Sequence, residues 1–276
     1  MSGGADPFDE AAGSLITAVV PQPCGASWLL LPGWQQSAAH WTPVARWLAG
    51  SGITLRAADL ATAADGCVAP RGTLARTEEL VDRLLAETVT AEAVIVAGHS
   101  AGAPLAVLLA VALPGVQAVV MVEPVASHFG TAPPCAAVPG MPGVPGGLRR
   151  LRDQYPMAAE ATLRSIDAAA RRLPGSEPAG PARGPAPADD RRAARAGQAL
   201  AATRVPVLVV RGQASALLSE QDARTLAAMA PFGRCVTVPD AGHSPHIDRP
   251  RATAAYLTDF AAELTEHPTD LRRSIP

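Results

Sequence analysis

The stretch VIVAGHSAGAPLAVLLAVALP, residues 94–114, decides the fold of this chain. Its first three residues are apolar and β-branched, as in a buried strand, and the apolar run from Ala103 is typical of a buried helix. The small and polar residues 98–102 connect the two and place Ser100 at the turn. We interpret this strand, turn and helix as a nucleophile elbow, the G-x-S-x-G turn that presents a serine side chain.

The two glycines of the turn agree with this interpretation. A serine at a sharp strand-to-helix turn needs small residues two positions before and after it, because neighbouring backbone passes close by. Gly98 and Gly102 occupy those positions. The turn also places Ser100 at a helix N-terminus, where free N–H groups stabilise negative charge, so the N–H of Ala101 is a candidate oxyanion donor. The alternative is a glycine-rich loop without a chemical role.

The composition excludes several classes of protein. The 276 residues are 48% hydrophobic and 17% charged, with a net charge of −2 and a pI near 6.3. Such a chain can bury a large core, and it lacks the basic surplus typical of proteins that bind nucleic acid or anionic membranes. The four cysteines are scattered without metal spacing, as expected for reduced thiols. Residues 1–14 do not resemble a signal peptide, so we expect a cytoplasmic protein that associates with neither nucleic acid nor a membrane.

Strands and helices alternate along most of the chain. The predicted strands are 15–20, 28–31, 53–57, 94–96, 116–122, 205–210 and 235–238. The predicted helices are 41–48, 73–88, the run from 103, 219–229 and 251–264. This alternation predicts an α/β fold with a doubly wound, mostly parallel sheet, whose site lies at the carboxyl ends of the strands. Residues 1–124 and 205–276 form this core domain.

Residues 125–204 interrupt the alternation. They are rich in proline and glycine and contain one clear helical stretch, 157–172, and a short helix at 191–202. An irregular apolar segment of this kind suits a loop that covers a pocket. We therefore predict that residues 125–204 form a lid inserted into the core domain.

His243 is the predicted general base. A serine hydroxyl becomes a good nucleophile when a neighbouring base takes its proton. His243 follows the last predicted strand, in a loop that can return to Ser100, although a loop histidine that only packs is the alternative. At the same edge Gly33 ends a strand, so the N–H of Trp34 is the second candidate oxyanion donor, unless Trp34 merely packs.

The other histidines have weaker claims to that role. His99 is next to Ser100 but is expected to point away from it, and we assign it a structural role. His246 is expected to line the loop that carries His243. The remaining three histidines are His40, His128 and His267.

Four segments together resemble the α/β-hydrolase superfamily, in its esterase, lipase-like and C–C hydrolase branch. The segments are LLLPGWQQSAAHW, AGHSAG, VPVLVVRG and VPDAGHSPHIDRP. The resemblance implies Ser100 as nucleophile, His243 as base, and the N–H groups of Ala101 and Trp34 as oxyanion hole. The chain departs from the family where Pro32 replaces the usual histidine before Gly33. It departs again where Ala216 stands in place of the usual acid.

Glu123 is the predicted acid that replaces the missing one. It ends the strand after the elbow, on the catalytic edge of the sheet, and Met121-Val122-Glu123 resembles the pattern of the haloalkane dehalogenase branch. That branch needs an aspartate nucleophile, which Ser100 replaces here, so its reaction is disfavoured. The order serine, acid, histidine is preserved. The alternatives are a strand-end Glu123 that only caps a loop, and the acids Glu220, Asp222 and Asp240.

These residues predict a serine hydrolase that cleaves an ester, thioester or lactone of an apolar small molecule through an acyl-enzyme. No cofactor and no metal are expected. One alternative is a lyase or cyclase, in specialised metabolism, that uses Ser100 and His243 to move a proton. The other alternative is a binding protein for a small molecule. The sequence indicates neither the substrate nor the oligomeric state.

Overall fold

A computed structural model of the chain describes residues 9–10, 16–20, 27–33, 36–49, 54–58, 94–132, 147–171 and 190–266. Its centre is an eight-stranded sheet in the order β1-β2-β4-β3-β5-β6-β7-β8. The strands are β1 Asp9–Glu10, β2 Ile16–Val20, β3 Ser27–Leu31, β4 Thr54–Ala58, β5 Val94–His99, β6 Val116–Val122, β7 Val207–Gly212 and β8 Gly233–Val238. The strands from β4 to β8 pair in parallel, and β1 and β2 pair antiparallel at one edge. The predicted doubly wound, mostly parallel sheet is confirmed.

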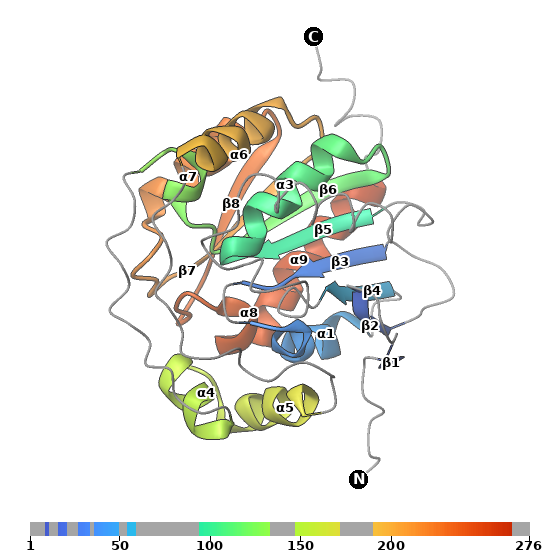
Figure 1. Cartoon of the computed structure of the whole chain (residues 1–276), viewed down its shortest axis with the longest axis vertical. Coiled ribbons are helices and arrows are strands. Elements are labelled where there is room, and N and C mark those ends of the chain that lie inside the picture. The colour runs from blue at the N-terminus through green and yellow to red at the C-terminus, as the bar shows by residue number, and fades with distance from the viewer. Residues whose placement is uncertain are drawn as a thin grey trace.

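Helices cover both faces of this sheet (Figure 1). The main helices are α1 Thr42–Leu48, α3 Ala103–Ala112, α6 Asp190–Ala202, α7 Glu220–Met229, α8 Pro245–Asp248 and α9 Pro250–Glu266. Leu29 and Leu31 of β3 pack with α3, α6 and α7, whereas Trp28 and Leu30 pack with α1, α8 and α9. Because side chains alternate along a strand, a strand buried on both faces reads as a continuous apolar run.

The first strand was not predicted from the sequence. The N-terminal residues look loose and acidic, but Asp9 and Glu10 pair antiparallel with β2. Two residues are too few to show the alternation that identifies a strand, so β1 depends on the neighbouring edge of the sheet.

The segment between β6 and β7 differs in detail from the prediction. The predicted helix 157–172 begins later, as α5 Glu160–Ala170, because Ala159 is extended with φ −65° and ψ 143°. A helix that was not predicted, α4 Leu148–Gln154, precedes it. The predicted short helix is α6, which packs on α3 and belongs to the layer that covers the sheet. The helix predicted at 73–88 lies outside the described residues.

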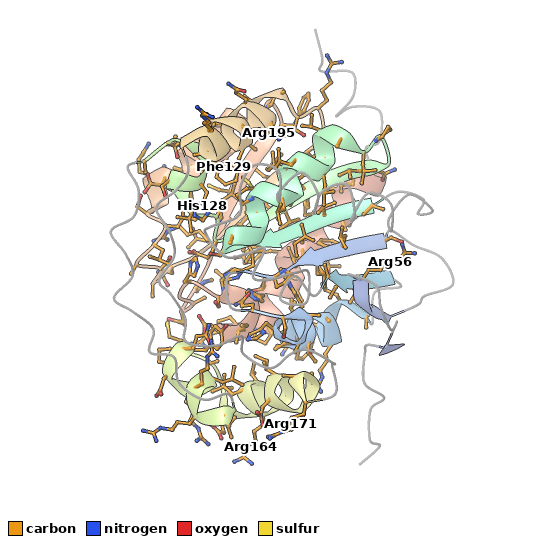
Figure 2. The ribbon with its side chains drawn as sticks, in the orientation of Figure 1. Arg56, His128, Phe129, Arg164, Arg171 and Arg195 are labelled. Carbon is orange, nitrogen blue, oxygen red and sulfur yellow. The ribbon has the colours of Figure 1, made fainter. Side chains whose placement is uncertain are left out.

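Helices α4 and α5 lie together beyond α1 and α8 at the lower end of the view (Figure 1). Leu163 and Ile166 of α5 are buried against the rest of the protein. Arg164, on the other side of the same helix, and Arg171, which caps its C-terminal end, extend outward (Figure 2). The helix is therefore amphipathic and docks through its apolar side. In the part of the chain that the structure describes, no helix is both long and apolar enough to cross a membrane.

Candidate active site

Ser100 follows β5 directly and starts the short helix η3 Ser100–Gly102, which continues into α3. Its φ is +47°, a left-handed backbone conformation that is strained in residues other than glycine. A Cβ atom at Gly102 would lie 2.7 Å from the carbonyl oxygens of Leu31 and Pro32, which leaves no room for a larger residue. The strand, turn and helix predicted for the elbow are confirmed.

His243 connects the elbow to the end of β6. It lies in the loop between β8 and α8, and its Nε2 is 3.0 Å from Ser100 Oγ. Its Nδ1 is 3.0 Å from Glu123 Oε2. The exposed fraction of the side chain is 26% for His243 and 0% for Glu123. The three residues predicted as nucleophile, base and acid thus form one continuous line of hydrogen bonds.

Glu123 is held by backbone and side-chain donors at the end of β6. Its own N–H donates to the carbonyl oxygen of Val210 at 2.7 Å, and its φ is +48°. Oε1 accepts from the N–H of Gly212 at 2.5 Å, and Oε2 accepts from Ser215 Oγ at 2.6 Å. A buried carboxylate needs such donors because water cannot reach it.

The other predicted acids lie elsewhere. Asp222 accepts from Ser219 Oγ at 2.6 Å at the start of α7, and Glu220 forms an ion pair with Arg224. Asp240 is exposed, and its N–H donates to the side chain of Gln213. Of the four acids considered from the sequence, Glu123 is the one that contacts His243.

The end of β7 and the loop that carries His243 come into close contact at Gly212. A Cβ atom there would lie 2.6 Å from the carbonyl oxygen of Ala241, two residues before His243. The N–H of Ala214 donates to the same carbonyl oxygen at 2.8 Å. The end of β7 therefore packs directly on the loop that carries the predicted base, and a side chain at residue 212 would separate them.

The predicted oxyanion hole is described in part. Ala101 lies in η3, at the start of the helical segment, where N–H groups generally have no partner within the helix. Trp34 lies outside the described residues. The neighbouring Gly33 N–H donates to Gln36 Oε1 at 3.0 Å, so the side chain of Gln36 holds this loop after β3.

His99, which precedes Ser100 in the chain, contacts both the loop after β3 and the loop that carries His243. Its Nδ1 is 2.8 Å from Gln36 Oε1, and its Nε2 is 2.8 Å from the carbonyl oxygen of His243. Gln36 Nε2 also donates to the hydroxyl of Tyr155, which follows α4. His99 therefore contacts the main chain of the predicted base and not Ser100 Oγ, in keeping with the structural role expected of it. Gln36 and Tyr155 were not identified from the sequence, because 63 and 119 residues separate the partners of these bonds.

A group of buried rings lies next to His99. The ring of His246 is fully buried, 4.5 Å from the centroid of His99 and 4.6 Å from that of Trp41. His246 therefore lies in the core and does not simply line its loop, as was expected. Burial lowers the pKa of His40 to about 4 and lowers the pKa values of His99 and His246 well below the usual value of 6.5. Burial therefore favours the neutral form of all three rings, and in this form His99 donates through one of its two ring nitrogens.

This histidine group predicts acid-sensitive stability. A pKa of about 4 for folded His40, against 6.5 when unfolded, means that the unfolded chain binds more protons between these pH values. Stability is therefore highest above pH 6.5 and falls with pH, by about 3 kcal/mol for His40 at pH 4. His99 and His246 add to this loss. Urea unfolding at pH 7.5, 6 and 5 measures it, and a free energy of unfolding that stays constant would contradict the prediction.

His128 and Asp248 are two further polar residues that follow β6 and β8. His128 lies in η4 Ala126–Phe129, which packs against α6 and α7. Asp248 Oδ2 accepts from the N–H of Gly242 at 2.8 Å, and burial raises the pKa of its carboxyl group. His267 lies outside the described residues.

Among the residues that the structure describes, no three His, Cys, Asp or Glu side chains are grouped so as to hold a metal ion.

Comparison with known proteins agrees with the fold. The sequence profile described as the Alpha/beta hydrolase family matches residues 28–256. No curated protein sequence matches the chain at a significant level. A novel esterase from Mycobacterium tuberculosis has 21% sequence identity and a TM-score of 0.66, with 95% of this chain and 92% of that chain covered. The thioesterase domain from the curacin biosynthetic pathway has 22% identity and a TM-score of 0.63, with 91% and 97% covered. Carboxylesterase CesB from Bacillus subtilis has 19% identity and a TM-score of 0.60, with 94% and 93% covered. The chain belongs to the alpha/beta hydrolase family.

Proposed function

We propose that this protein is a serine hydrolase that cleaves an ester, thioester or lactone of an apolar small molecule. The observation that carries the proposal is the line of hydrogen bonds from Ser100 Oγ through the His243 ring to the buried Glu123 carboxylate. The three groups occur in the chemical order that nucleophilic acyl transfer requires. The family profile, and the esterases and thioesterase that share the fold, support the reaction class.

In this proposal each residue has one role. His243 Nε2 takes the hydroxyl proton while Ser100 Oγ attacks the carbonyl carbon. Glu123 keeps the other ring proton on Nδ1 and stabilises the imidazolium that forms. The N–H groups of Ala101 and Trp34 stabilise the oxyanion. His243 then gives its proton to the leaving group. In the second half of the reaction His243 takes a proton from water, which attacks the acyl-enzyme. The carboxylic acid product leaves as His243 returns the proton to Ser100 Oγ.

The proposal requires no metal and no cofactor, because the nucleophile is activated by a side chain. We expect a cytoplasmic protein that acts on a small molecule and does not bind nucleic acid or a membrane. Helices α4 and α5, from the predicted lid 125–204, serve to cover the substrate, whereas α6 of that segment belongs to the layer over the sheet. The alternative as a lyase or cyclase was motivated by the altered position of the acid. The 3.0 Å contact between Glu123 and His243 supports the hydrolase, because acyl transfer needs an acid that stabilises the imidazolium.

Covalent labelling with a fluorophosphonate tests the proposal directly. The wild-type protein is expected to be labelled on one serine and to hydrolyse a series of p-nitrophenyl esters. Ser100→Ala should abolish both. Ser127→Ala, which removes another buried hydroxyl, is the matched control and should keep both. A folded wild-type protein that neither accepts the label nor hydrolyses any ester would overturn the proposal.

A further inference from the structure

Ser215 is a residue of the site that has no role in the proposed reaction. It lies between β7 and α7, and its Oγ is 2.6 Å from Glu123 Oε2, the same oxygen that faces His243 Nδ1. Its Oγ also accepts hydrogen bonds from the N–H groups of Leu217 and Leu218, each at 3.2 Å. A single hydroxyl therefore has three partners, and each can be assigned a direction.

The assignment follows from the capacity of a hydroxyl group. A serine hydroxyl has one hydrogen to donate and two lone pairs to accept. Backbone N–H groups can only donate, so Leu217 and Leu218 occupy both lone pairs. The one hydrogen of Ser215 must then point at Glu123 Oε2. Oε2 is therefore the acceptor of this hydrogen bond.

The same reasoning continues to the histidine ring. Oε1 of Glu123 accepts from the N–H of Gly212, so each oxygen accepts a hydrogen bond, and this arrangement favours the ionised carboxylate. An ionised carboxylate can only accept, so the Nδ1 of His243 donates to Oε2. In the neutral ring, Nε2 then has a lone pair that faces Ser100 Oγ. This is the tautomer that a general base needs.

We propose that Ser215 is a positioning residue that, with the N–H groups of Leu217 and Leu218, orients the Glu123 carboxylate and thereby sets the tautomer of His243. The proposal rests on the proposed function, because it assigns the acid and the base their roles. Gly212 holds one carboxylate oxygen and Ser215 holds the other, so the carboxylate plane has one orientation. Without the hydroxyl, Oε2 keeps His243 as its one described partner, and the orientation of the carboxylate about its last bond is less restricted.

The test compares two substitutions of Ser215. Ser215→Ala is expected to lower kcat for p-nitrophenyl ester hydrolysis by about tenfold to a hundredfold, with KM unchanged, because a hydrogen bond to a charged group is lost. Ser215→Thr keeps the hydroxyl and should retain kcat within about threefold. The matched control is Ser219→Ala, which removes another hydroxyl 2.6 Å from a carboxylate, that of Asp222, and should leave kcat unchanged.

A double substitution separates positioning from simple structural support. If Ser215 acts through Glu123, then Ser215→Ala should reduce the rate no further in a Glu123→Gln protein. A purely structural role predicts that the two losses multiply. For every variant, thermal unfolding is monitored by circular dichroism to check that the protein is folded. If Ser215→Ala does not fold, Ser215→Cys replaces it, and its weaker donor should still lower kcat at unchanged KM.

The outcomes distinguish this proposal from the proposed function. A Ser215→Ala protein with wild-type kcat, beside an inactive Glu123→Gln protein, overturns the role of Ser215 and leaves the proposed triad. A loss that multiplies in the double variant, or one that Ser215→Thr shares, also overturns it. A Glu123→Gln protein with wild-type kcat overturns both.

Discussion

Replacing His243 by alanine is expected to lower kcat for ester hydrolysis by about 10⁶-fold, an effect as large as that of Ser100→Ala. His243 Nε2 lies 3.0 Å from Ser100 Oγ, and no other group is described as bonded to that hydroxyl. Without the ring, the serine proton has no acceptor and the hydroxyl is a poor nucleophile. Because the two residues act as a unit, adding Ser100→Ala to His243→Ala should cost almost nothing more.

Burst and steady-state kinetics with p-nitrophenyl esters measure this effect. The matched control is His246→Leu, which removes a histidine three positions away whose two ring nitrogens have no hydrogen-bond partner among the described residues. That variant should keep kcat within about threefold while circular dichroism shows an unchanged fold. An active His243→Ala protein would show that the base is another residue.

Replacing Glu123 by glutamine is expected to lower kcat by about 10⁴-fold with little change in the fold. Glutamine has the same shape as glutamate but presents an NH₂ group in place of one carboxylate oxygen. With its oxygen toward the Gly212 N–H, the NH₂ group faces His243 Nδ1, which must then accept a hydrogen bond. The ring proton moves to Nε2 and faces Ser100, so the histidine is in the wrong tautomer to act as a base.

The control for this prediction is Asp240→Asn, the same exchange of acid for amide at another residue of positive φ, +52°. Asparagine adopts this backbone conformation readily, so the fold should be kept. The kcat of this variant should equal that of the wild type. If Asp240→Asn is inactive and Glu123→Gln is not, the acid of the site is Asp240.

Much of the fold could be predicted because its signals are local. Long strands and helices show their apolar patterns within a few residues, and the predicted strand at 116–122 has the bounds of β6. The helix α4 was missed because it is only seven residues long and starts with Leu148 and two arginines, which show no apolar period. The start of α5 was predicted too early. The extended conformation of Ala159 cannot be recognised from the pattern of polar and apolar residues around it.

Some residues of the candidate site could likewise be predicted from the sequence, and others could not. Ser100, Ala101, His243 and Glu123 could be named from motifs and from their places after strands. Ser215, Gly212 and Gln36 could not, because a serine or glutamine in a loop has no pattern of its own. Ser215 stands just before Ala216, the residue at which the resemblance leads one to expect an acid, and this was the one available signal.

By itself, the sequence determined the elbow, because the strand, the tight glycine turn and the helix around Ser100 are all encoded within about twenty consecutive residues. It also determined the parallel sheet, which follows from the alternation of apolar strands and helices. Only the tertiary structure decided which acid reaches the histidine, since Glu123 and His243 are 120 residues apart. The pattern of apolar and polar residues indicates which residues are buried. The partner of a buried carboxylate depends instead on the donors that folding brings to its two oxygens.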